Sequence, residues 1–425
     1  MTSFRLGERA APVGWSVVPA GHLFRREKRS GYEAEQLLSV YRDYGVIPKD
    51  SRTDNFNKAS EDLGAYQLVE PNDLVINKMK AWQGSLGVSE HRGIVSPAYF
   101  VASPTREFNR RFVHYLLRCE DYLVEYQTRS AGIRVNQWDL DWEDFRRVPL
   151  ALPPLEYQER IANFLDEQTA RIDALIAEKE LLLSKLDELR WARVAKELLT
   201  EPLSTARPLR LKYLVESCQN GLWGDEPIED GTNVIVVRVA DFDKKNRRVT
   251  LENPTLRHIA QEKLQSRLLR RGDLLIEKSG GGPTTPVGNV VMFDADVPAI
   301  CSNFIARMPV AKGHDPAFVC LMFQALYALG KNVPHIKQTS GIQNLDADSY
   351  LSQTVPIPPF EEQQILAQQI LADFASMEAL AESSIAAVEL LREYRSSLIS
   401  AAVTGQLDLS TFKAIAPTAE TNMPA

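Results

Sequence analysis

Apolar residues recur at alternating spacings of three and four through two long stretches of the chain, residues 151–204 and 356–410. On a helix this spacing gathers apolar side chains along one side, as in helices that pack as a coiled coil. The pattern therefore predicts two long spacer helices. The predicted coiled-coil interface consists of Ile161, Leu165, Ile172, Leu175, Lys179, Leu182 and Leu186 in the first helix and Leu366, Ile370, Asp373, Met377, Leu380 and Leu391 in the second.

The second helix repeats the first. The segment PPLEYQERIANFL at 153–165 returns as PPFEEQQILAQQIL at 358–371, an offset of 205 residues. In both copies proline suits the start of a helix, because the N–H that it lacks would have no partner there. Two unrelated core helices, the alternative explanation, would not share these flanking motifs. We therefore interpret the chain as an internal duplication.

The polar interruptions of the seam recur at the same offset. Gln168 and Lys179 in the first helix correspond to Asp373 and Ser384 in the second. If the two helices pair antiparallel, aligning these interruptions predicts that Lys179 faces Asp373 and that Gln168 faces Ser384.

The repeat divides the remainder of the chain into two globular parts. Because 425 residues are too many for one ordinary domain, residues 1–150 and 205–355 are predicted to fold separately, and residues 411–425 to form a flexible tail. Both parts alternate strand-like and helical segments, including predicted helices over 108–127 and 315–329.

A fainter repeat lies inside the globular parts, where NDLVINKM at 72–79 matches GDLLIEKS at 272–279. The predicted fold class is α+β. It comprises two α/β domains of shared topology, separated by two long helices that pair as an antiparallel coiled coil. Divergent loops on such duplicated scaffolds suit two different binding specificities.

The net charge of −7 argues at first against a polyanionic partner, but the charge is unevenly distributed. Residues 1–150 hold 21 Lys/Arg and 20 Asp/Glu, and residues 205–355 hold 18 and 16. The helical stretches hold 7 and 11 (151–204) and 3 and 9 (356–425). The acidity therefore belongs to the helices, and only the globular parts can offer the basic surface that contact with DNA requires.

Composition also limits location and cofactors. No apolar run is long enough to span a bilayer, and the N-terminal segment lacks the apolar core of a signal peptide, so we expect a cytoplasmic protein without a membrane partner. The cysteines at 119, 218, 301 and 320 are too far apart for a zinc site or a disulfide framework. No metal or cofactor is expected in this chain.

Three motifs resemble parts of enzymes, and each lacks a required element. IPPF at 357–360 is similar to the tetrapeptide of amino-methyltransferases, but Ile357 replaces the Asn or Asp that holds the target amine. Asp73 and Asp273 lack the acid-x-Lys spacing of a metal-dependent nuclease. The run KSGGGPTTPVG at 278–288 lacks the ending of a nucleotide-binding loop, which leaves contact with the DNA backbone or a plain surface loop.

The segment KMKAWQGSLG at 78–87 combines lysines with an aromatic residue, a mixture that suits phosphate and groove contact. Trp82 either packs in the local core or touches DNA. From side-chain chemistry and loop position, we select as DNA contacts Lys78, Lys80, Arg92, Arg134 and Asn136 in the first part and Arg238, Lys278, Ser279, Thr284, Lys337 and Gln343 in the second.

The order of these segments resembles the specificity subunit of type I restriction-modification systems over nearly the whole chain. The most specific elements are NKMKAWQGSLGV, GIVSPAYFV, the two helix starts PPLEYQERI and PPFEEQQIL, and SSLISAAVTGQLDL at the end of the second helix. The first helix departs from that ending, because Leu199 to Pro202 stand where the glycine would be.

The resemblance implies that each globular part is a target-recognition domain that reads one half of a bipartite, asymmetric double-stranded DNA site. The helices would hold the halves apart and dock two methyltransferase subunits, and a restriction or translocase subunit is a further candidate partner. This chain would be non-catalytic, with methyl donor, ATP and magnesium bound by partner subunits. Two alternatives stay open: a self-contained DNA methyltransferase or nuclease, and a coiled-coil scaffold without a DNA role.

Overall fold

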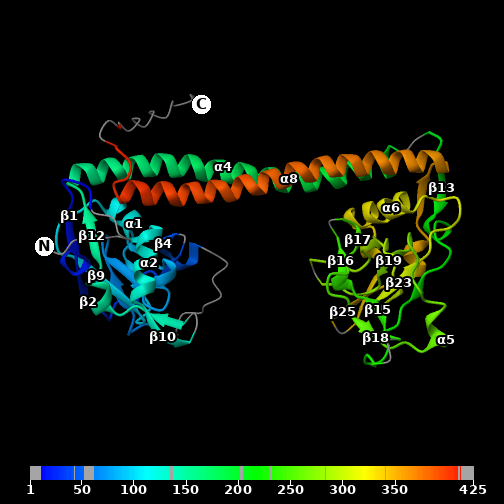
Figure 1. Cartoon of the computed structure of the whole chain (residues 1–425), viewed down its shortest axis with the longest axis horizontal. Coiled ribbons are helices and arrows are strands. Elements are labelled where there is room, and N and C mark those ends of the chain that lie inside the picture. Colours follow the sequence, from blue (N-terminus) through cyan, green and yellow to red (C-terminus); the bar gives the residue numbers. More distant parts are fainter. Residues whose placement is uncertain are drawn as a thin grey trace. The chain divides into compact units, whose positions relative to one another are not determined.

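The computed structural model describes residues 11–42, 44–51, 62–134, 137–201, 204–229, 232–244, 246–282, 284–339, 341–409 and 412 (Figure 1). It forms two compact units, and each contains a globular part and half of each long helix. Unit 1 comprises Met1–Lys179 and Ile385–Ala425, and unit 2 comprises Glu180–Ser384. The boundary crosses both long helices, so the domain limits given above, which separate whole helices from the globular parts, stay a prediction.

Unit 1 is built around an antiparallel sheet in the order β2-β9-β6-β7. Alternate residues of a strand point to opposite faces. Leu74 and Ile76 of β6 therefore enter the main core with residues of α1 and α2, while Val75 joins a smaller cluster on the other face. The sheet strands are β2 Phe24–Glu27, β9 Tyr99–Pro104, β6 Leu74–Asn77 and β7 Leu86–Val88, and the helices are α1 Arg110–Arg118, α2 Glu120–Arg129 and the single turn α3 Trp142–Phe145.

Short strand pairs and 3-10 turns complete unit 1. The pairs are β1 with β12, β3 with β4, β5 with β8, and β10 with β11. The strands are β1 Ser16–Pro19, β3 Leu38–Tyr41, β4 Gly45–Pro48, β5 Gln67–Val69, β8 Gly93–Val95, β10 Ala131–Arg134, β11 Gln137–Asp139 and β12 Pro149–Leu152. The 3-10 turns are η1 Ala20–His22, η2 Lys49–Ser51 and η3 Ala81–Gln83.

Unit 2 is built around a sheet in the order β14-β23-β19-β21-β17-β16. Leu274 and Ile276 of β19 pack with Phe318 and Phe323 of α6, which repeats the relationship of β6 to α1. The sheet strands are β14 Gln219–Asn220, β23 Ile305–Met308, β19 Leu274–Glu277, β21 Val290–Met292, β17 Arg248–Val249 and β16 Phe242–Asp243, and the main helix is α6 Pro316–Ala328.

The remaining elements of unit 2 are short. The strands are β13 Arg207–Arg210, β15 Val234–Val237, β18 Leu256–Arg257, β20 Ser279–Gly280, β22 Ala299–Cys301, β24 Ile336–Thr339, β25 Ile342–Leu345 and β26 Thr354–Ile357. The helical turns are α5 Gln261–Leu264, α7 Ala347–Leu351, η5 Leu211–Tyr213, η6 Val239–Asp241 and η7 Val333–His335.

The duplication is visible in strand register. In unit 1, β1 pairs antiparallel with β12, and Ser16 lies opposite Leu152. In unit 2, β13 pairs antiparallel with β26, and Arg207 lies opposite Ile357, which is 205 residues beyond Leu152. The turns α3 and α7 also begin 205 residues apart. The predicted fold class, with two α/β parts of shared topology, is confirmed.

The two predicted helices differ in outcome. The helix expected over 315–329 is α6. The helix expected over 108–127 is two helices, because Cys119 between α1 and α2 has an extended backbone. No proline or glycine marks this break in the sequence, so the prediction of one continuous helix is wrong.

The long helices are α4, Leu155–Ala195, which continues as a π-helical turn over Lys196–Thr200, and α8, Phe360–Val403. In unit 1 the Tyr157 hydroxyl accepts from the Leu409 backbone N–H, and Arg395 binds Asp173 at 2.9 Å. In unit 2 the Trp191 ring lies 5.8 Å from the Phe374 ring. As residue numbers increase along α4, the numbers of the α8 residues that they contact decrease. The helix halves within each unit therefore run antiparallel (Figure 1).

The structure corrects three positions of the predicted coiled-coil interface. Leu175, Leu182 and Leu380 are exposed, so their assignment to the interface is wrong. The residues packed in their place lie one position later, at Thr169, Ile176, Leu183 and Arg190 in α4 and at Phe374, Ala381, Val388 and Arg395 in α8. The remaining predicted residues are buried at Ile161, Leu165, Ile172 and Ile370, and partly buried at Lys179, Leu186, Leu366, Asp373, Met377 and Leu391.

The pairing predicted for Lys179 is also wrong. In unit 2, Asp373 forms an ion pair with Arg193, with an Nη2–Oδ2 distance of 2.6 Å. Arg193 lies two heptads beyond Lys179 in the sequence. A shift by whole heptads keeps the apolar columns facing each other, so apolar spacing alone could not fix the register. The linked pairing of Gln168 with Ser384 fails for the same reason.

Candidate nucleic-acid interface

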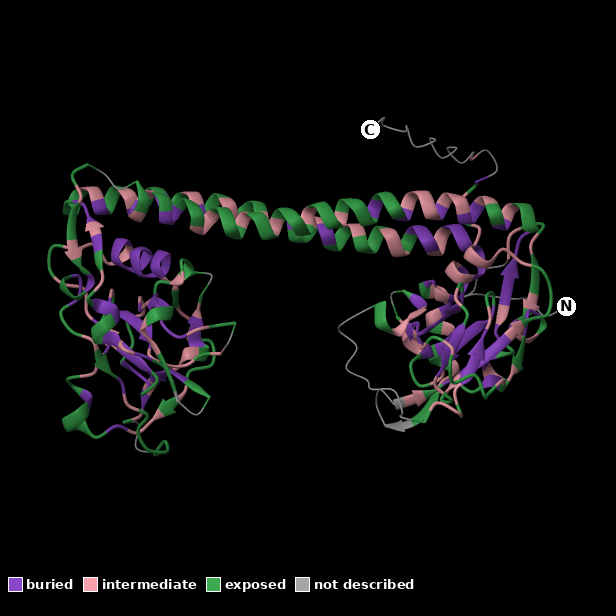
Figure 2. Ribbon diagram, turned by 180° about the vertical axis from the view of Figure 1, so that it is seen from behind, coloured by how far each residue is buried: buried purple, intermediate pink, exposed green. Residues whose placement is uncertain are grey.

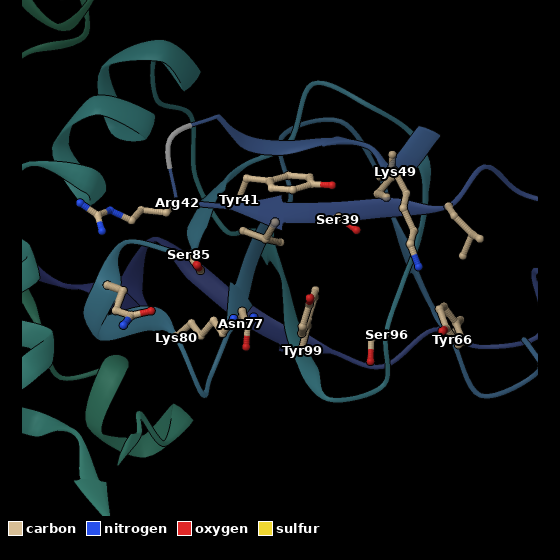
Figure 3. A pocket seen from close by; sticks show the side chains of 14 residues that line it. Ser39, Tyr41, Arg42, Lys49, Tyr66, Asn77, Lys80, Ser85, Ser96 and Tyr99 are labelled. Atoms are coloured by element: carbon tan, nitrogen blue, oxygen red, sulfur yellow. The ribbon is translucent and has the colours of Figure 1, made fainter. Parts of the chain in front are cut away.

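Unit 1 has a cavity of about 450 Å³ where β3 faces the ends of β6 and β9 (Figure 3). Its lining comes from β3, η2, η3 and the loops around them. None of the described residues that line it is acidic. The residues used in the argument are Ser39, Tyr41, Lys49, Tyr66, Asn77, Lys80 and Tyr99.

Asn77 and Tyr99 form one side of this cavity. They lie directly opposite each other on β6 and β9. The same sheet face carries Val75 and Val101, which belong to a buried cluster, so Asn77 and Tyr99 continue that face beyond the apolar core. The Asn77 N–H donates to the Ser85 carbonyl at 3.0 Å, which fixes the backbone from which the amide projects.

Three tyrosines surround the cavity. Burial raises the pKa of Tyr99, and the nearby phenols of Tyr41 and Tyr66 raise it further. Tyr99 therefore keeps its proton at neutral pH and can donate a hydrogen bond to an acceptor such as a phosphate oxygen. Aromatic rings beside hydroxyl groups also offer a flat surface to sugars and bases.

The cations of this cavity differ from the other candidates in unit 1. Lys49 and Lys80 form no ion pair with any residue that the structure describes. Arg92, in contrast, binds Glu35 at 3.0 Å and also Glu70, and these carboxylates raise the pKa of Arg92. Lys78 lies 3.4 Å from Asp139. A DNA phosphate would have to compete with carboxylates at Arg92 and Lys78, but not at Lys49 or Lys80.

The concave shape limits what the cavity can bind. Base edges are recessed in the grooves of a duplex and are read by protruding side chains, whereas the sugar–phosphate backbone forms a convex ridge. An acid-free hollow with unpaired lysines, phenols and an amide is complementary to that ridge. The arrangement is chemically suited to clamping one strand of a duplex.

In unit 2, the loop that follows β19 occupies the place of the loop that follows β6. Ser279 donates from its hydroxyl to the Asn344 side-chain oxygen at 2.7 Å. Gln343 is buried, and its amide oxygen accepts from the Val287 N–H at 3.2 Å. Its amide nitrogen donates to the Gly282 carbonyl at 3.3 Å. Gln343 thus holds the glycine-rich loop in place, and contact with DNA would require breaking these bonds.

Some candidates of unit 2 meet on the sheet β20-β25-β24, where Ser279 and Lys337 both lie opposite Asn344, whereas Arg238 and Thr284 lie on other elements. Arg238 is paired with Asp241 at 2.7 Å, and Lys337 with Asp346 at 2.7 Å. Lys278 follows β19 and is partly buried. Thr284 is exposed and lines a separate cavity of unit 2. In unit 1, Arg134 ends β10, and Asn136 lies outside the described residues.

Comparisons with known proteins bear on these two units. A family model described as the type I restriction modification DNA specificity domain matches residues 210–390. The EcoKI specificity subunit of Escherichia coli (strain K12) is 21% identical over 421 residues, covering 93% of this chain and 90% of that protein. The StySPI specificity subunit of Salmonella potsdam is 21% identical over 424 residues, with the same coverages. This chain is therefore similar to type I restriction-modification specificity subunits over nearly its whole length.

Solved structures agree on the fold. A chain from a study of complex assembly and conformational transition of the type I R-M system is 16% identical, with a TM-score of 0.69 and coverage of 94% of this chain and 100% of that chain. The HsdS subunit from Thermoanaerobacter tengcongensis is 18% identical, with a TM-score of 0.56 and coverage of 94% and 99%. In the part of the chain that the structure describes, no helix is long and apolar enough to cross a membrane.

The two acids that resembled part of a nuclease site, Asp73 and Asp273, have structural roles in this chain. The Asp73 carboxylate accepts from the Glu70 N–H at 2.8 Å and binds Arg29. Asp273 repeats the arrangement by accepting from the Arg270 N–H at 2.7 Å and binding Arg307. Both acids therefore brace the turn that precedes an inner strand. Among the described residues, no group of His, Cys, Asp and Glu is arranged to hold a metal ion.

Trp82 packs locally. Its ring lies 5.0 Å from that of Trp138, and its indole N–H donates to the Met79 carbonyl at 3.2 Å. This contact favours the local-packing explanation, because it fixes the loop that carries Lys80.

Sequence reasoning missed most of the cavity of unit 1. Of the residues that line it, only Lys80 was selected. The omitted residues include Ser39, Tyr41, Lys49, Tyr66, Asn77 and Tyr99. Ser39 and Tyr41 alternate on one strand, which was a usable signal for a shared face. Their proximity to Asn77 depends on tertiary packing, which no local pattern reports.

Proposed function

We propose that this chain is the DNA-recognition subunit of a type I restriction-modification complex and reads a bipartite, asymmetric double-stranded site. The observation that carries the proposal is the acid-free cavity of unit 1, where Lys49 and Lys80 lie beside Asn77 and Tyr99 without an ion pair to any described residue. Similarity to specificity subunits over nearly the whole chain supports the same function.

The asymmetry of the site follows from the unlike ends of β6 and β19. Asn77 ends β6 with an amide that lines the cavity. At the same place Glu277 ends β19, where its carboxyl is buried. Burial raises the pKa of Glu277. A carboxylate paired with an arginine would instead have a lowered pKa. Two units that differ so much at one position would bind unlike half-sites.

The test is selection from a pool of randomised duplexes by the full chain, purified with the methyltransferase subunits that accompany it in its own cells. We expect enrichment of two short, unlike sequences separated by a fixed spacer. Absence of any enriched sequence would refute sequence recognition and favour a scaffold without a DNA role. Methyl transfer by the chain alone would instead favour a self-contained enzyme.

The long helices would dock two methyltransferase subunits, as a second part of the proposal. From Asp173 to Arg193 no residue of α4 is buried, although this stretch contains four large exposed leucines (Figure 2). Leu175, Leu182 and Leu189 recur at heptad spacing, which is the pattern that a further helix recognises. Methyl donor, ATP and magnesium would then bind the partner subunits, and a restriction subunit is a further candidate.

A further inference from the structure

Unit 2 has a cavity of about 700 Å³ between α4 and its globular part. One side is formed by residues 187–192 of α4, among them Trp191. The other side is formed by Thr284 and Thr285 in the loop after β19, and the end of α6 closes the space. All of these residues belong to unit 2.

The duplication shows what fills the equivalent place in unit 1. Ser396 of α8 corresponds to Trp191 at the offset of 205, and Gly84 lies in the loop after β6. Helix α2 bridges these two positions. The Ser396 hydroxyl donates to Glu120 at 2.7 Å, and Leu123 lies 3.4 Å from the point where a Gly84 Cβ would stand. In unit 1, therefore, a helix of ten residues occupies this space.

Unit 2 has no counterpart of α2 among its described residues. Helix α6 runs on to Ala328, whereas α1 ends at Arg118 and the chain turns into α2. The residues that follow α6 form only a turn and the short η7. The space between Trp191 and Thr284 is consequently open in unit 2, whereas α2 fills the equivalent space in unit 1.

Two polar atoms on the cavity lining lack partners. Gln324 is 4% exposed, and its side-chain nitrogen donates to the Val290 carbonyl at 2.7 Å, which leaves its oxygen without a hydrogen bond. Asn289 is 8% exposed, and its side-chain oxygen is likewise unpaired. Buried acceptors without donors are rare in proteins, because each costs about 1–3 kcal/mol. Both oxygens are covered by neighbouring atoms, so they mark a polar floor beneath the groove and are not themselves open to an occupant.

We infer that this groove of unit 2 binds an amphipathic helix of a partner methyltransferase subunit, in the place that α2 fills in unit 1. The inference rests on the proposed function, because it assigns a surface for a partner named there. The helix would present an apolar or aromatic side chain to Trp191. Its length would match the ten residues of α2.

The position of the groove favours a subunit that also binds α4. Leu189 is 57% exposed and stands between Glu188 and Arg190, which both line the groove. A partner that covers the exposed leucines of α4 therefore reaches the groove without a gap. Asp187 on the same side would attract a basic residue near the end of the docked helix, whereas Glu188 is paired with Lys185 at 2.8 Å.

Substitution at Leu329 tests the proposal in the full chain. Leu329 lines the groove and is 47% exposed, so Leu329→Glu places a charge there without disturbing the core. Leu256→Glu is the matched control, because Leu256 is 45% exposed and lies on β18 outside the groove. We expect Leu329→Glu to weaken binding of the purified methyltransferase subunit at least about tenfold, as for the loss of an interface anchor, and Leu256→Glu to leave it unchanged.

Hydrogen exchange shows which residues the partner covers, and crosslinking identifies the occupant. In the assembled complex we expect protection of residues 187–192 and 324–329 relative to the chain alone, and a photo-crosslinker at position 285 should attach to a helical peptide of the methyltransferase. Equal exchange in both states, or unchanged affinity of Leu329→Glu, would overturn the inference. A crosslink to a second copy of this chain would overturn it too. Selection of a bipartite DNA site by the same complex would show that the proposed function stands even then.

Discussion

The side-chain oxygen of Gln158 accepts a hydrogen bond from the backbone N–H of Asn109 at 2.9 Å. Gln158 lies in the first turn of α4, and Asn109 caps α1, so this bond ties the long helix to the globular part of unit 1. In unit 2, Gln363 accepts from the N–H of Asp315 at 3.0 Å, and Asp315 caps α6. The glutamine of each Pro-Pro-x-x-x-Gln motif therefore positions a globular part on its helix.

Removal of this bond should destabilise the unit that contains it. Gln158→Ala and Gln363→Ala each remove a buried amide and leave a partly buried N–H without its acceptor, so we expect each to lower the free energy of unfolding by about 1–3 kcal/mol. Urea denaturation measures the loss. Gln364→Ala is the control, because Gln364 is exposed on the same turn of α8 as Gln363. Equal effects of Gln363→Ala and Gln364→Ala would contradict the positioning role.

Salt dependence should separate unpaired from paired cations in unit 1. Each phosphate contact removed lowers the slope of log affinity against log salt by about one. We expect that reduction for Lys49→Ala and for Lys80→Ala, with the same preferred sequence as the unchanged chain. Arg92→Ala should change the slope little, because Glu35 and Glu70 already neutralise Arg92. Lys78, which was selected from sequence as a DNA contact, is paired with Asp139, so Lys78→Ala tests whether that carboxylate competes with phosphate.

The corrected helix interface predicts unequal costs for two apolar positions of α8. Phe374 is 2% exposed, so Phe374→Ala should cost about 3–5 kcal/mol of stability. Leu380 is 47% exposed in the free chain, so Leu380→Ala should change stability by less than about 0.5 kcal/mol. Thermal and urea unfolding of the two variants compare them directly. The reverse order of costs would restore the interface predicted from sequence.

Acidification should destabilise unit 1 through His114. Burial lowers the pKa of His114 to about 3, and Arg118 and Arg110 act in the same direction. An unfolded histidine has a pKa of about 6.5, so between these values only the unfolded state binds the proton. Stability is then full above pH about 6.5 and falls toward pH 3, by at most about 1.4 kcal/mol per unit.

Unfolding curves at several pH values measure this slope. His114→Gln should reduce it by as much as one proton, and His22→Gln is the control for an exposed histidine. An unchanged slope in His114→Gln would contradict the assignment.

The exposed leucines of α4 should matter for assembly and not for folding. Leu182→Gln and Leu189→Gln alter residues that are 38% and 57% exposed, so the free energy of unfolding should change little. Binding of methyltransferase subunits should weaken, which light scattering of the assembled complex would detect as lost mass. Unchanged assembly by a double variant would exclude this surface as the docking site.

The elements that repeat along the chain could be predicted from the sequence. The helix interface could not, because packing selects between neighbouring apolar residues that fit the same spacing. The offset of 205 fixes β12 against β26 and α3 against α7, because each copy must bury the same faces. The packed column of the coiled coil could not be chosen, because Leu175 and Ile176 are both apolar and spacings of three and four fit equally well.

The candidate site was harder to predict for a related reason. Asn77 is polar at the end of an apolar strand, and only the arrival of β3 across from it turns it into part of a cavity. Charge alone also misled, because Arg92 and Arg238 look available in sequence but bind carboxylates in the fold. A cation free to meet a phosphate can be recognised only after its neighbours are known.

The exposed leucines of α4 also bear on how the cell must make this protein. A copy made without its partner subunits would expose this apolar row to water, and such copies would aggregate or be bound by chaperones. Its yield in soluble form should therefore rise when the companion polypeptides are made alongside it in matching amounts.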